Sequence, residues 1–129
     1  MQTFTSPEVI VNKSAEDFFN KISDLNNLQE IMPSQIENFK STEETCSFEI
    51  QGMPKIELEI SEKIKFSKVS LNAKNSPNPF KLNCFIKEKE NQCQARLEIN
   101  IEINMMMRMM IEKPLTQFLD VLSHKMQNF

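Results

Sequence analysis

The sequence predicts an α+β protein in which an antiparallel β-sheet packs against a long C-terminal helix. Between Glu44 and Ile103, apolar and polar residues alternate through at least four strands. Because side chains alternate across a strand, this pattern gives a sheet with one apolar face and one polar face. After Ile103 the apolar residues recur every three or four positions, which is the spacing of one side of a helix.

The alternation divides the strand residues into an inward apolar set and an outward polar set. The inward set is Cys46, Phe48, Ile50, Ile56, Leu58, Ile60, Val69, Leu71, Ala73, Phe80, Leu82, Cys84, Ile86, Ala95, Leu97, Ile99, Ile101 and Ile103. Only Phe85 breaks the outward set. Burying the larger inward side chains would contribute roughly 1.5–3 kcal/mol each, so the core needs no metal or disulfide.

The elements before the alternating region are a strand and two short helices. Residues 3–12 are predicted as the first strand, with Pro7 marking an edge or a bulge. Ser14 is predicted to cap a helix over the sequence AEDFFNKI, and a second helical turn ends at Pro33. Residues 36–40 then form a second strand.

Short links join the later strands. Turns are predicted around Gly52, at residues 64–68, in the proline-rich loop 75–79 and at residues 88–91. Links of this length favour antiparallel neighbours, which gives about seven strands in all. Because the sequence contains no repeat and no linker, we expect residues 1–129 to form a single domain.

The C-terminal helix is predicted to begin after Asn104, which is a favourable capping residue. Its apolar stripe is Met107, Ile111, Leu115, Phe118, Leu122, Met126 and Phe129. Pro114 interrupts the stripe. A proline removes a backbone donor, so it either kinks a continuous helix or begins a second helical segment.

This order of elements resembles the helix-grip fold of the START-like, polyketide cyclase-related (SRPBCC) superfamily. The resemblance is carried by VIVNKSAEDFFNKISDLNNLQEIMP at residues 9–33, with Asp24 in the turn before Pro33, and by the closing NMMMRMMIEKPLTQFLDVLSHKM. It covers essentially the whole chain. It implies a curved sheet wrapped around the C-terminal helix, often with an apolar cavity between them. The superfamily includes lipid carriers, cyclases, dioxygenase subunits and co-chaperones, so the fold alone does not select a function.

Composition argues against several other classes of protein. The net charge is −3 and there is no basic run, so nucleic acid is not expected as a partner. No apolar run reaches the ~18–20 residues of a membrane span. The N-terminal residues lack the pattern of a signal peptide, so we expect the protein to be cytoplasmic. With one glycine and three unclustered cysteines, neither a phosphate-binding glycine loop, nor a metal site, nor any other cofactor is predicted.

The sequence predicts a ligand site between the apolar face of the sheet and the C-terminal helix. Its proposed lining is Phe48, Leu58, Leu71, Leu82, Leu97, Ile99, Met107, Ile111, Leu115 and Phe118. Glu62 would join a polar rim if its strand kept strict alternation, and it would face water if the strand ended near residue 61. Arg108 is either a solvated side chain or a cation that meets an acidic ligand group. The lone histidine, His124, is expected in solvent near the helix C-terminus, and no catalytic residue is predicted.

Five of the nine methionines lie between Met105 and Met110. Met105, Met106, Met109 and Met110 either pack against the mouth of the sheet, line a ligand entrance or dock a protein partner. The leading functional prediction is binding of an apolar small molecule in a groove between sheet and helix. The alternative is a protein-interaction or co-chaperone-like module with a collapsed core, and the third possibility is a cyclase-type enzyme.

Overall fold

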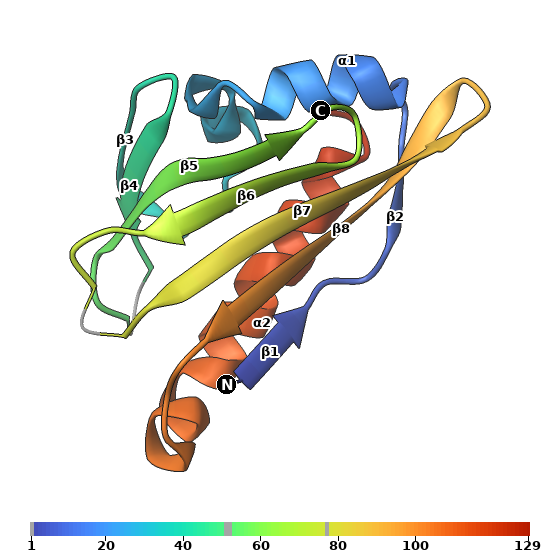
Figure 1. Ribbon diagram of the computed structural model, residues 1–129. Coiled ribbons are helices and arrows are strands. Elements are labelled where there is room, and N and C mark those ends of the chain that lie inside the picture. Colours follow the sequence, from blue (N-terminus) through green and yellow to red (C-terminus); the bar gives the residue numbers. More distant parts are fainter. Residues whose placement is uncertain (1, 51–52, 77) are drawn as a thin grey trace.

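The computed structural model describes residues 2–50, 53–76 and 78–129, in which a sheet of eight strands packs against one long helix (Figure 1). The elements in chain order are β1 (Gln2–Thr5), β2 (Val9–Val11), α1 (Ala15–Ile22), the 3-10 helix η1 (Leu25–Ile31), β3 (Glu37–Ser41), β4 (Thr45–Glu49), β5 (Ile56–Ile64), β6 (Lys68–Ala73), β7 (Phe80–Lys89), β8 (Gln92–Ile101) and α2 (Met105–Met126). The strand order is β1-β8-β7-β6-β5-β4-β3, and β2 also pairs with β8. The recorded strand pairs are antiparallel. The predicted α+β fold is confirmed.

The predicted first strand is two strands in the structure. Phe4 of β1 pairs with Ile99, and Val11 of β2 pairs with Cys93, so both strands lie along β8. Pro7 separates them because it has no backbone N–H to donate to a sheet. Next to the break, the amide of Leu97 donates to Ser6 Oγ at 2.9 Å, which keeps the chain attached to β8.

Both predicted helix caps are present. The Ser14 hydroxyl accepts from the amide of Asp17 at 3.1 Å, and the Asn104 side chain accepts from the amide of Met107 at 2.8 Å. Each cap satisfies a backbone donor that the first helical turn leaves without a partner. Gly52 and Pro77, at which turns are predicted, lie outside the described residues.

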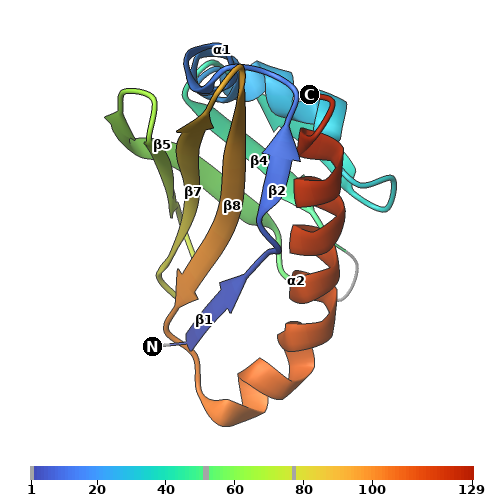
Figure 2. The same ribbon diagram turned by 90° about the vertical axis from the view of Figure 1, so that its right-hand side faces the viewer.

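Helix α2 lies along the apolar face of the sheet, and α1 with η1 covers one end of the sheet (Figures 1 and 2). Fourteen of the eighteen residues predicted to point inward are buried, and the other four are half-buried. The half-buried residues are Ile60, Ala73, Phe80 and Ile103. The core therefore occupies the space between the sheet, α2 and α1, as the alternation predicts.

The outer face of the sheet is less exposed than the sequence predicts. Ser70 and Asn83 are both buried, and the Ser70 hydroxyl donates to Asn83 Oδ1 at 2.6 Å. They face each other on the central strands β6 and β7. Phe85, the exception in the polar set, lies between the Lys68 ammonium (5.7 Å) and the Arg96 guanidinium (4.6 Å), which favour an aromatic face.

Helix α2 continues through Pro114, so the alternative of two separate helical segments is wrong. Figure 2 shows that the first part of α2 runs at an angle to the rest of the helix and extends beyond the end of the sheet. Because proline has no N–H, the Met110 carbonyl loses its usual partner within the helix. None of the helices in the described part of the chain combines the length and apolar character that crossing a bilayer requires.

The missing hydrogen bond and the weaker packing should make the start of α2 open more readily than its end. We expect amide hydrogen exchange to be faster in residues 105–112 than in residues 117–124, where Phe118, Leu119 and Leu122 are buried. Mass-spectrometric exchange on the folded protein measures this directly. Equal protection in the two segments would show that Pro114 does not divide α2 into parts of different stability.

Candidate ligand-binding site

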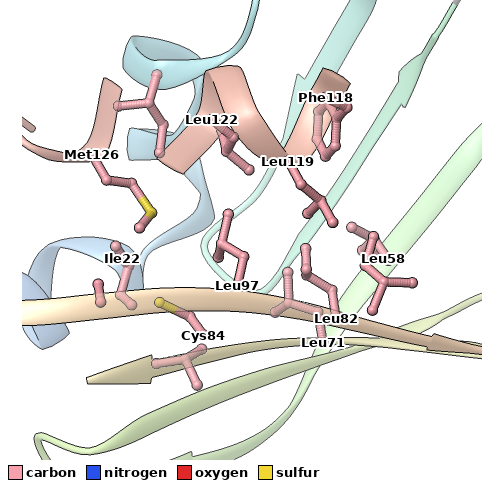
Figure 3. Close-up of a cluster of buried hydrophobic side chains, with 14 of the residues drawn as sticks. Ile22, Leu58, Leu71, Leu82, Cys84, Leu97, Phe118, Leu119, Leu122 and Met126 are labelled. Carbon is pink, nitrogen blue, oxygen red and sulfur yellow. The ribbon is translucent and has the colours of Figure 1, made fainter. Parts of the chain in front are cut away.

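An apolar cavity of about 50 Å³ lies between the sheet and the C-terminal half of α2. Its walls come from β4 to β8, from α1 and η1, and from one side of α2. In Figure 3, Phe118 and Leu122 of α2 lie across the cavity from Leu82 and Leu97 of the sheet. All of its described lining residues are apolar, and Cys84 contributes its only thiol. A space of this kind can bury apolar surface and offers no directional polar contact.

A second apolar cavity of about 30 Å³ lies beside the first, and residues of β4, β5, β7, β8 and α2 line it. Four residues line both spaces, namely Phe48, Leu58, Leu82 and Phe118. The rings of Phe48 and Phe118 are stacked, with centroids 5.6 Å apart and an angle of 23° between their planes. Both rings of this stacked pair therefore belong to residues that line the two cavities.

Eight of the ten residues predicted to line a site come together around these cavities. They are Phe48, Leu58, Leu71, Leu82, Leu97, Ile99, Leu115 and Phe118. Ile111 is buried elsewhere in the core and Met107 is half-buried, and neither lines the described walls of the cavities. The role of the eight residues in binding remains a prediction.

The expectation that Glu62 joins a polar rim is wrong, because a β-bulge reverses its direction. Ile60 pairs with Leu71, but Glu62 pairs with Ser70, so Ser61 is an extra residue in β5. Strict alternation would place Glu62 inside, and one inserted residue moves it to the outer face. There its carboxylate is exposed and lies 3.1 Å from the Lys68 ammonium. Strand β5 also continues to Ile64, beyond the end at residue 61 that we considered.

Arg108 faces β1 and does not line either cavity. Its guanidinium donates to the side chains of Gln2 and Glu112, and it lies 5.3 Å from the centre of the Phe4 ring. The side chain is half-buried. These contacts hold the start of α2 against the edge strand β1. Arg108 therefore makes a structural contact and does not lie at the mouth of the apolar space.

The four methionines predicted as core, entrance or docking surface point into solvent. Met105, Met106, Met109 and Met110, here called the Met surface, are 66–77% exposed. At helical spacing they lie opposite the buried stripe of Ile111, Leu115 and Phe118. They therefore do not pack against the mouth of the sheet, which leaves ligand entrance and protein docking as the alternatives.

The three cysteines are buried and unpaired by disulfides. Burial raises the pKa of the Cys46 thiol to about 12, and burial, together with the nearby Cys93, raises the pKa of Cys84 to about 12. Burial and the Glu88 carboxylate raise the pKa of Cys93 to about 11. A thiol rather than a thiolate is therefore present in each case at neutral pH, and the cysteines behave as small apolar residues.

These raised pKa values make the stability of the fold depend on pH above 9. In the unfolded chain the thiols ionise near 9.0, whereas Cys46 and Cys84 stay protonated in the folded state up to about 12. The folded state therefore binds more protons in this window, and the free energy of unfolding falls as pH rises through it. Between pH 8 and 10 we expect a loss of about 1 kcal/mol for each buried thiol. Urea denaturation of wild type and Cys46→Ala/Cys84→Ala should show a shallower fall in the variant, and parallel curves would contradict this account.

His, Cys, Asp and Glu are side chains that can hold a metal ion. No group of three or more His, Cys, Asp or Glu side chains gathers in the part of the chain that the structure describes. Buried side-chain nitrogen and oxygen atoms among the described residues all have hydrogen-bond partners.

The sequence prediction missed the part of the wall that α1 and η1 provide. Ile22, Leu25, Leu28, Ile31 and Met32 line the larger cavity from these two elements. In the sequence, Ala15, Phe18, Phe19, Ile22 and Leu25 recur at helical spacing, so the pattern marks Ile22 and Leu25 as buried. The pattern does not indicate that this helix closes the end of the same apolar space as α2.

Comparison with known proteins identifies the architecture. No family model and no curated protein sequence matches the chain. Among solved structures, a START superfamily protein from Mycobacterium smegmatis matches with a TM-score of 0.71 and 10% identity, over 97% of this chain and 94% of that chain. A protein from Thermus thermophilus matches with a TM-score of 0.74 and 11% identity, over 98% and 94%. A norcoclaurine synthase point mutant from Thalictrum flavum, in complex with a transition-state analogue, matches with a TM-score of 0.66 and 9% identity, over 96% of both chains. The chain therefore has the START-like helix-grip fold that its sequence predicts.

Proposed function

We propose that the protein binds an apolar small molecule, such as an acyl chain, between the sheet and α2. The observation that supports this most directly is the character of the two adjacent cavities, whose described walls are entirely apolar. The similarity in fold to a norcoclaurine synthase structure that contains a transition-state analogue is consistent with a small-molecule ligand.

The volumes of the two cavities limit the size of the ligand and the affinity with which it can bind. Drug-sized ligands occupy pockets of ~300–1,000 Å³, whereas these cavities measure about 50 and 30 Å³. A ligand must therefore push α2 and the sheet apart, or move the Phe48 and Phe118 rings, and the free energy of that movement is lost from binding. We expect weak, permissive binding of slender apolar molecules.

Calorimetric titration with fatty acids and alcohols of increasing length tests the proposal. Each added CH₂ that enters the apolar space should strengthen binding by ~0.8 kcal/mol, which is about fourfold in Kd. The head group should matter little, since the described walls carry no hydroxyl, amide or charged side chain.

Two variants on β5 test which face of the sheet binds the ligand. Leu58→Phe fills the cavity side and should weaken binding across the series, whereas Glu62→Gln on the outer face should leave the affinities unchanged. The proposal fails if no member binds to delipidated, folded protein. Strong head-group selectivity that Glu62→Gln abolishes would contradict an apolar site.

The Met surface favours a second candidate function, a protein-interaction module. Monomeric proteins seldom expose a contiguous group of large apolar side chains, and such groups often mark interaction sites. Methionine also adapts to partners of varied shape. Under this hypothesis the cavities stay closed, and the Met surface packs against an apolar surface of a partner protein.

A further inference from the structure

A surface groove of about 280 Å³ runs beside the middle of α2. Its described walls are Pro33, Gln35 and Ile36 after η1, Ile50 after β4, and Pro114 and Gln117 on α2. Phe118 also lines the groove, although only 4% of its surface is exposed, so its ring lies at the base. The groove is mostly apolar, with two amide side chains that face solvent.

Phe118 connects this groove to the interior. Of the residues that the structure describes, Phe118 alone lines the groove and both internal cavities. Rotation of this one side chain to another rotamer is therefore the smallest movement that could join the groove to the two cavities.

Two features around Phe118 favour such a rotation. Its ring stacks on Phe48, and the Phe48 ring stacks in turn on Phe39 at 6.2 Å, so flat faces slide against one another without interlocking branches. Pro114 lies one helical turn before Phe118 and removes the hydrogen bond to the Met110 carbonyl. The backbone that carries Phe118 is thereby weakened on the side of the groove.

We propose that Phe118 is the gate of the apolar site and that the ligand enters through this groove and not at the Met surface. This inference rests on the proposed function, since a gate without a ligand has no role. Rotation of the Phe118 ring admits an acyl chain between the Pro33–Ile36 segment and α2. Its return then closes the site over the bound chain.

Stopped-flow fluorescence with cis-parinaric acid, a fluorescent fatty acid, tests the gate by its rate. Phe118→Leu shortens the gate and should raise the association and dissociation rate constants about tenfold or more, while Kd changes much less. Gln117→Trp adds bulk to the exposed margin of the groove without altering the core, and should slow association about tenfold. If Phe118→Leu does not fold, Gln117→Trp still tests the gate.

Each variant has a matched control. Phe18→Leu shortens another buried phenylalanine, which packs on Phe129 and lines none of the three spaces, so it reports general loosening of the core. His124→Trp adds the same bulk at an exposed position of α2 away from the groove. Both controls should associate with the fatty acid at the wild-type rate.

The gate is overturned if the fatty acid binds to wild type at equilibrium but Phe118→Leu and Gln117→Trp leave its rates unchanged. It is also overturned if Phe18→Leu accelerates association as much as Phe118→Leu does. Absence of equilibrium binding to folded wild type would instead overturn the proposed function, and the gate with it.

Discussion

Replacing Phe118 with alanine is expected to lower the free energy of unfolding by about 3–5 kcal/mol, as for other large buried aromatic residues. The ring is buried, stacks on Phe48 and lines both cavities, so its removal enlarges a space that is already partly empty. Urea denaturation followed by circular dichroism measures the loss. Met109→Ala is the control on the same helix, because a side chain that is 77% exposed should change stability by no more than about 0.5 kcal/mol.

The same variant links stability to binding. Phe118→Ala creates a larger apolar cavity, so an apolar ligand that binds only the folded state should restore part of the lost stability. Saturating decanol should therefore raise the midpoint of Phe118→Ala more than that of wild type. If Phe118→Ala lowers the free energy of unfolding by less than about 1 kcal/mol in the absence of ligand, the packing of α2 on the sheet is not the one described here.

Leu97→Ala is expected to cost about 2–5 kcal/mol. Leu97 is buried on β8, the strand that pairs with β1, β2 and β7, and its side chain lines the larger cavity. Truncation enlarges a space that is already partly empty, so the lost contacts are not replaced. Because the enlarged cavity stays beneath Phe118, ligand affinity should be kept or increased.

Gln94→Ala tests whether the cost of Leu97→Ala comes from the face of the strand. Gln94 is three residues earlier on β8, on the polar side of the alternation, and only half-buried. Denaturation of the two variants should therefore differ by at least about 2 kcal/mol. Similar losses would mean that the inward register assigned to β8 is wrong.

The sheet and the main helices are predictable because their signals are local. Alternation places Leu58, Leu82 and Leu97 on one face without reference to the rest of the chain. The caps at Ser14 and Asn104 likewise depend on a few neighbouring residues. The break at Pro7 follows from a missing donor, although the sequence does not determine whether the chain ends there or bulges.

The direction of Glu62 is not predictable from β5 alone. Its bulge is a property of the pairing between β5 and β6, where Glu62 lies opposite Ser70 and the Ser61 hydroxyl donates to the Ser70 carbonyl at 3.3 Å. An alternating sequence is compatible with either register beyond the bulge. Ser70 and Asn83 are a similar case, since their mutual hydrogen bond depends on the pairing of β6 with β7.

The candidate site is predictable in composition and not in volume. The apolar pattern identifies eight of its wall residues, but the space left among them depends on how closely α2 approaches the sheet and on the rotamers of Phe48 and Phe118. Helical spacing places Met105 and Met109 on one side of α2. Where the helix leaves the sheet, and so whether that side meets solvent, depends on the whole fold.

The most direct test of binding between sheet and α2 is the position of a bound ligand. An isotope-filtered NOE experiment with unlabelled decanol and protein labelled at leucine and methionine methyl groups measures it. The account predicts NOEs from decanol to the methyl groups of Leu58, Leu82 and Leu97, which line the larger cavity. NOEs confined to the methyl groups of Met105, Met106, Met109 and Met110 would contradict it and would place the binding activity of this protein on the Met surface.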